Sequence, residues 1–82
     1  MATTTTQVTA VTNHNILLAI KDQDTTKNAV ARKSGIPATT FDRKIDGHTG
    51  FTLRELGAVA EALGLELIDI LPINLLTAKV AA

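Results

Sequence analysis

The 82-residue chain is long enough for one small domain, and the absence of cysteine excludes disulfides and thiolate metal sites. Its only aromatic residues are two Phe, and an aliphatic composition of this kind favours a helical core over a sheet. The formal net charge is zero, and there is neither a signal peptide nor an apolar run approaching the ~20 residues of a membrane span, so we expect a cytoplasmic protein without membrane contact.

The first eleven residues are rich in Thr and lack the apolar spacing of a helix, which predicts a flexible arm over residues 1–11. The first helix is expected to begin near Thr12 or Asn13, because both residue types are good N-caps, and to end near residue 22. Three apolar side chains at helical spacing should form its buried face: Ile16, Leu17 and Ile20. His14 has no second metal ligand at helical spacing, so it is interpreted as a surface histidine.

Residues 25–45 contain the pattern of two short helices joined by a tight turn. A threonine at position 25 or 26 can cap the first helix, and Gly35 suits its end because glycine readily adopts a positive φ. The second helix, about Ala38 to Ile45, buries Phe41 and Ile45 and leaves a short, polar and basic face exposed. This arrangement is typical of a helix-turn-helix that presents its second helix to a DNA groove.

The second half of the chain predicts two more helices and an apolar tail. Thr52 and Glu55 form a capping-box pattern ahead of an apolar stripe that ends at Gly64, and a short fifth helix should follow over residues 66–71. We therefore expect an all-α domain of five helices over residues 12–72. Residues 73–82 repeat apolar side chains at helical spacing, and they form either a sixth helix packed on the domain or an apolar surface for a partner.

Charge is segregated along the chain although its total is zero. Residues 27–54 hold only two acidic side chains but most of the basic ones, which are Lys27, Arg32, Lys33, Arg43, Lys44 and Arg54. Such segregation gives a neutral molecule one positive face, which suits a nucleic-acid partner. For Arg32 the alternative is a pairing with acidic residues of the first helix.

The ordered pattern A-x-x-x-G-I-P-x-x-T-F, followed by F-T-L-x-E-L-x-x-V-A-E-A-L-G-L, resembles the lambda-repressor-like helix-turn-helix family of phage and bacterial regulators. The resemblance covers residues 13–72 and implies a compact five-helix domain whose third helix enters the major groove. Many members carry a glutamate at the end of that helix, paired with the first helix. This chain has Ile45 at that position and Ile20 where the first helix would supply the partner.

By position, the resemblance implies that Ala38, Thr39 and Arg43 read bases. Thr40 and Lys44 would meet flanking phosphates. Arg43 is the best candidate because its guanidinium can donate two bonds to guanine, worth about 1–3 kcal/mol, with a phosphate contact or a salt bridge as the alternative. The full set of predicted DNA contacts includes three further polar or basic residues and reads Lys27, Asn28, Ala38, Thr39, Thr40, Arg43, Lys44 and His48.

These features predict a sequence-specific transcription regulator that binds double-stranded DNA, such as a phage or prophage repressor or a Cro-like protein. A homodimer is expected, because one helix reads few base pairs and paired half-sites would supply the missing specificity. The alternative is a protein-interaction module, such as the antitoxin of a toxin–antitoxin pair, that binds its partner through residues 73–82. No catalytic constellation, cofactor motif or metal-ligand spacing is present in the sequence, so no enzyme is expected.

Overall fold

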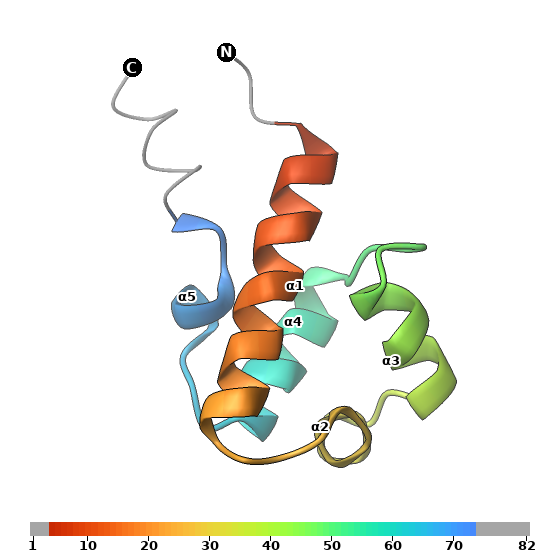
Figure 1. Ribbon diagram of the computed structural model, residues 1–82, viewed down its shortest axis with the longest axis vertical. Coiled ribbons are helices and arrows are strands. Elements are labelled where there is room, and N and C mark those ends of the chain that lie inside the picture. The colour runs from red at the N-terminus through yellow and green to blue at the C-terminus, as the bar shows by residue number, and fades with distance from the viewer. Residues whose placement is uncertain (1–3, 74–82) are drawn as a thin grey trace.

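The computed structural model describes residues 4–73, and five helices account for most of them (Figure 1). In chain order the helices are α1 (Thr5–Asp22), α2 (Lys27–Ser34), α3 (Ala38–Ile45), α4 (Leu53–Ala62) and α5 (Leu67–Ile70). No strand occurs within these residues. The prediction of an all-α domain of five helices is therefore confirmed.

α1 begins at Thr5, well before the start expected near Thr12 or Asn13. The hydroxyl of Thr4 accepts a hydrogen bond from the Gln7 N–H at 3.1 Å, and the Thr4 N–H donates to the Gln7 side-chain oxygen at 2.8 Å. This reciprocal pair is a capping box, which satisfies backbone donors that a helix start leaves free. Residues 5–11 of the expected flexible arm are thus helical. They lack an apolar stripe because this part of α1 extends beyond the other described helices (Figure 1).

One hydrophobic core joins all five helices. Its largest fully buried side chains include one from each helix and are Ile16, Val30, Phe41, Val59 and Ile70. The predicted burial of Phe41 and Ile45 is confirmed, and Ile20 lies in the same core as Ile45. An apolar pair therefore stands where the family resemblance implied an ion pair. Leu17, expected in the core, is 41% exposed because it borders a cavity beside α1.

Three side-chain amides of α1 and its C-cap reach the ends of three other helices. Asn13 donates to the last carbonyls of α3, Asn15 to those at the end of α5, and Gln23 to the carbonyl that follows α4. The last carbonyls of a helix have no partner within the helix, so these amides supply donors that the backbone lacks. Asn13, expected at the start of a helix, is instead buried in the middle of α1.

The predicted tail falls almost wholly outside the described residues. Within residues 73–82 only Ile73 is described, and its half-buried side chain lies with Val11, Ile68 and Leu71 along a groove between α1 and α5. The sixth helix and the partner surface predicted for the tail therefore lie outside the part of the chain that the structure describes.

Candidate nucleic-acid interface

The turn between α2 and α3 is fixed by bonds between residues close in sequence. The Thr26 hydroxyl caps α2 by accepting a hydrogen bond from the Ala29 N–H at 3.1 Å. Gly35 ends α2 with a φ of 78°, in the left-handed region that favours glycine. The Ile36 N–H then donates to the Ala31 carbonyl at 3.0 Å, and both of these side chains are buried. The predicted cap and helix stop are confirmed, and together they set the start of α3.

α3 turns its apolar side towards the core and its polar side outwards. Ala38, Thr39 and Arg43 are exposed, and Thr40 is half-buried. Thr39 and Arg43 are four residues apart, so they lie one helical turn from each other on the same face. α3 lies at the edge of the molecule in Figure 1, and no other described helix covers this outer face. The structure thus brings together the three side chains predicted to read bases.

The first turn of α2 lies beside α3. The ammonium of Lys27 is 3.8 Å from the Asp42 carboxylate. Both side chains are about half exposed, so this ion pair contributes little stability. Asn28 borders a shallow groove of about 390 Å³ that also contains Pro37 and Ala38. Of the two predicted contacts on α2, Asn28 therefore lies next to the start of α3, and Lys27 lies next to Asp42 further along it.

Arg32 lies in the same groove as Asn28 and Ala38, and its side chain is exposed. No ion pair joins it to the acidic residues of α1 within residues 4–73, so the alternative given for Arg32 is not what the structure shows. Arg32 was missed as a candidate contact. The available signal was its spacing of four from Asn28, which places both side chains on one face of α2.

Lys44 is turned away from the outer face of α3. Its ammonium is 2.6 Å from the Glu55 carboxylate and 3.2 Å from the Gly50 carbonyl, and its side chain is only 13% exposed. It also lies 6.0 Å from the centre of the Phe51 ring. The same Glu55 oxygen accepts the Thr52 N–H of the predicted capping box, which is confirmed. Hydrogen bonds from Lys44 and from the Thr52 backbone lower the pKa of Glu55.

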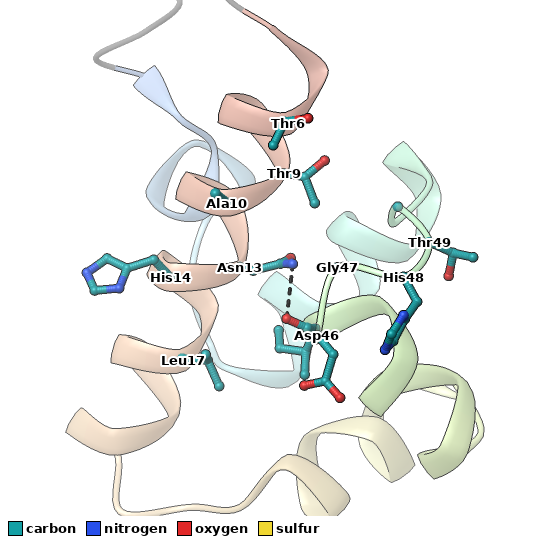
Figure 2. Close-up of a pocket in the computed structure, with 12 residues that line it drawn as sticks. Thr6, Thr9, Ala10, Asn13, His14, Leu17, Asp46, Gly47, His48 and Thr49 are labelled. Atoms are coloured by element: carbon teal, nitrogen blue, oxygen red, sulfur yellow. Dashed lines mark hydrogen bonds between the residues drawn. The ribbon is translucent and has the colours of Figure 1, made fainter.

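The loop between α3 and α4 folds back on the end of α3. The His48 N–H donates to the Arg43 carbonyl at 3.0 Å, and the His48 side chain is exposed. His48 and Thr49 form one wall of a cavity of about 660 Å³, whose other wall is the first half of α1 (Figure 2). Phe51 is not free to stack on a base, because its ring meets Phe41 edge-on at 5.6 Å.

Two other kinds of site are not found in the described structure. No cluster of three or more residues able to hold a metal ion occurs among residues 4–73, and His14 is exposed on α1 as predicted. None of the helices in this range is long and apolar enough to cross a membrane. The most distinctive surface that remains is the outer face of α3 with the start of α2.

Comparison with known proteins agrees with this geometry. The model of one family, described as the Cro/C1-type HTH DNA-binding domain, matches residues 15–74, which include all of α2 to α5. Neither the curated proteins nor the solved structures gave a match. The family match covers most of the chain, and the five helices have the order and the exposed third helix that the resemblance implied. The chain belongs to the family of Cro/C1-type helix-turn-helix DNA-binding domains.

Proposed function

We propose that this DNA-binding domain is a sequence-specific transcription regulator of the phage or prophage repressor or Cro type, which inserts α3 into the major groove. The observation that carries the proposal is the outer face of α3, where Thr39 and Arg43 are exposed on the side opposite the buried Phe41. A helix held in this way can enter the groove without uncovering the core. Family membership supports duplex DNA as the partner.

Base recognition is assigned to three side chains of α3. Arg43 would donate two hydrogen bonds to O6 and N7 of a guanine. Thr39 would bond a base edge or place its methyl group on a thymine methyl, and Ala38 would make only the apolar contact. With a single long donor on this face, specificity should depend most strongly on Arg43.

Phosphate contacts are assigned to residues around these three. We assign contacts with the DNA backbone to Lys27 and Asn28 at the start of α2, to Thr40 on α3 and to His48 in the following loop. Arg32 joins this group because it shares a groove with Asn28. Lys44 is left out, because its ammonium is already bound to Glu55 and to the Gly50 carbonyl. Phosphate contacts position the protein and add affinity, but they carry no sequence information.

A homodimer would complete the proposed function. One α3 helix reads few base pairs, whereas two copies on half-sites about 34–36 Å apart would read a longer, palindromic operator. Selection of bound sequences from random duplexes tests both the sequence specificity and the dimer. An enriched palindrome supports the dimer, and an enriched single half-site supports a monomer.

The decisive mutation is Arg43→Ala, measured with the selected duplex. The free energy of binding should become less favourable by about 1–3 kcal/mol, and the preference for one base at the contacted position should weaken. Lys33→Ala is the matched control, because Lys33 is an exposed basic residue that lies with Glu61 in a groove between α2 and α4, away from α3. Equal losses in the two variants would contradict base reading by Arg43.

Two further measurements test the phosphate contacts and the repression. The logarithm of the binding constant should fall steeply and linearly with the logarithm of salt concentration, because phosphate contacts release counterions. In a reporter assay, the chain should lower transcription from a promoter that contains the selected site. A flat salt dependence would refute the phosphate contacts, and unchanged or raised transcription would refute repression.

A further inference from the structure

The hydrogen bonds between Asn13 and α3 connect α1 directly to the recognition helix. The Nδ2 atom of Asn13 donates to the Lys44 carbonyl at 3.0 Å and to the Ile45 carbonyl at 3.1 Å. The dashed line at Asn13 in Figure 2 is the second of these bonds. The Lys44 carbonyl also accepts the Gly47 N–H. The Ile45 carbonyl has no other hydrogen-bond donor among the described residues. One buried amide therefore completes the C-terminal end of α3.

This amide spans a place where α1 and α3 are not closely packed. The cavity of about 660 Å³ lies between the first half of α1 and the end of α3, and Asn13, Leu17 and Ile45 are among the residues around it. Figure 2 shows the Asn13 side chain pointing from α1 across this space towards the α3–α4 loop. Because apolar packing is interrupted here, the two hydrogen bonds are a directional link between the helices.

The buried side chain of Asn13 is a poor source of stability for the core. Asn13 is only 6% exposed, and its Oδ1 atom is buried without a hydrogen-bond partner among residues 4–73. An unpaired buried acceptor opposes folding and offsets much of the stability that the two donated bonds contribute. Asn13 should therefore add little net stability, while its planar amide still fixes the direction of the α3 end.

We propose that Asn13 is a positioning residue for DNA recognition, which holds the C-terminal end of α3 against α1 and so sets the angle at which Thr39 and Arg43 face the groove. This inference rests on the proposed function of α3. Arg43 is the residue most affected, because it lies in the last turn of the helix, beside the carbonyls that Asn13 holds. Small errors in the position of a binding group weaken recognition even when the group itself is intact.

The chain contains a matched control two residues away. Asn15 also lies on α1, and its amide donates to the Ile70 and Leu71 carbonyls at 3.2 and 3.4 Å, at the end of α5. The chemistry of this link is the same, but it holds a helix that is not assigned to DNA. A role in stability alone predicts similar effects from both asparagines, whereas a role in positioning predicts that only Asn13 affects recognition.

The experiment compares Asn13→Leu and Asn15→Leu with the unmodified chain, on the duplex selected by that chain and on a scrambled duplex. All are measured at a temperature where thermal melts show each protein folded, and Asn13→Ala replaces Asn13→Leu if the latter does not fold. For the Asn13 variant we expect an affinity loss of about tenfold or more on the selected duplex, comparable to one lost base contact. On the scrambled duplex, the change should stay within about twofold, as for non-specific phosphate binding.

Asn15→Leu should alter the affinities for both duplexes by less than about threefold, since phosphate and base contacts are untouched. The proposal is overturned if the Asn13 variant keeps the affinity for the selected duplex, or if it loses affinity for both duplexes equally. It is also overturned if Asn15→Leu causes the same selective loss.

A DNA-free measurement separates this inference from the proposed function. Amide hydrogen exchange should quicken in the Asn13 variant over residues 44–49 and stay unchanged in α2 and α4. If the unmodified chain enriches no duplex, the proposed function fails while the exchange data still test the link between α1 and α3. Unchanged exchange over residues 44–49 would refute that link even if DNA binding is confirmed.

Discussion

The two ends of α3 are held in different ways. At the N-terminal end, the turn is fixed by Gly35 and by the bond from Ile36 to Ala31, all within a few residues of the helix start. At the C-terminal end, the fixing groups are Asn13 from α1 and Glu55 from α4, which bonds Lys44. One end therefore depends on local sequence and the other on helices brought together by the fold. This difference decides which changes should disturb the folding of α3 and which should disturb its orientation.

The largest expected effect comes from removing the buried aromatic side chain between the two ends of α3. Phe41 is fully buried in the middle of α3, and Phe41→Ala should lower the free energy of unfolding by about 3–5 kcal/mol. That is a large share of the about 5–15 kcal/mol of a typical domain. Urea unfolding followed by circular dichroism measures it. Leu53→Ala is the control, because Leu53 is 68% exposed and should change stability by less than about 0.5 kcal/mol. Similar losses in the two variants would refute the assigned core.

A smaller loss of stability should follow from a change at the N-terminal end of α3. Gly35→Ala forces a residue with a side chain into a φ of 78°, which should reduce stability by about 1–2 kcal/mol. The loss should come from backbone conformation alone, because a Cβ at this position would meet no atom within 4 Å. Thermal and urea unfolding measure the difference.

Gly50→Ala is the matched control for Gly35→Ala. A Cβ on Gly50 also meets no atom within 4 Å, but Gly50 does not have a positive φ. Its substitution should change stability by less than about 0.5 kcal/mol. Equal effects at the two glycines would show that the turn does not require a left-handed residue.

The smallest effect is expected at the C-terminal end, from the pair formed by Lys44 and Glu55. Glu55→Gln keeps a side chain able to bond the Thr52 N–H but removes the charge that faces Lys44. The pair is partly exposed, so the loss should be about 0.2–1 kcal/mol at neutral pH and low salt, and it should shrink at high salt. Unfolding in urea at two salt concentrations tests this. A larger loss at high salt would contradict an electrostatic contribution.

The same pair makes a prediction about pH. Lys44 lowers the pKa of Glu55 in the folded protein below its ordinary value of 4.5, so the ionised carboxylate stabilises the fold above that value. This contribution is lost as the pH falls below 4.5 and through the folded-state pKa. The stability difference between the unmodified chain and Glu55→Gln should therefore disappear in this acid range. A difference that persists at low pH would mean that the charge of Glu55 is not its cause.

The sequence was a good guide to the local structure around α3 and at the start of α4. The cap at Thr26, the stop at Gly35 and the capping box at Thr52 were all predicted, because each is made between residues three or four positions apart. The buried side of α3 followed from the spacing of Phe41 and Ile45. The exposed positions of Thr39 and Arg43 followed by elimination, whereas Ala38 was named from the family resemblance, and the roles of all three on DNA stay predictions.

Prediction failed where a residue had more than one plausible local role. The Thr-rich start has little helix propensity, and the capping box between Thr4 and Gln7 was overlooked. Lys44 looked like another basic residue of a DNA-binding face, but it turns towards Glu55 of α4. For Arg32 a pairing with acids of α1 was the alternative, and no such ion pair occurs within residues 4–73. For Lys44 the helical pattern gave the approximate face, and the packing of α4 beside α3 decided the partner.

Asn13 shows the boundary between what the sequence determined and what the tertiary structure decided. By itself the sequence specified the turn and the two faces of α3, because caps, glycine conformation and apolar spacing act over a few residues. It could not distinguish Asn13 as a helix cap from Asn13 as a link to carbonyls more than thirty positions away. Only the packing of α1 beside α3 made that choice, because a side-chain amide bonds whichever unpaired carbonyl the fold brings within reach.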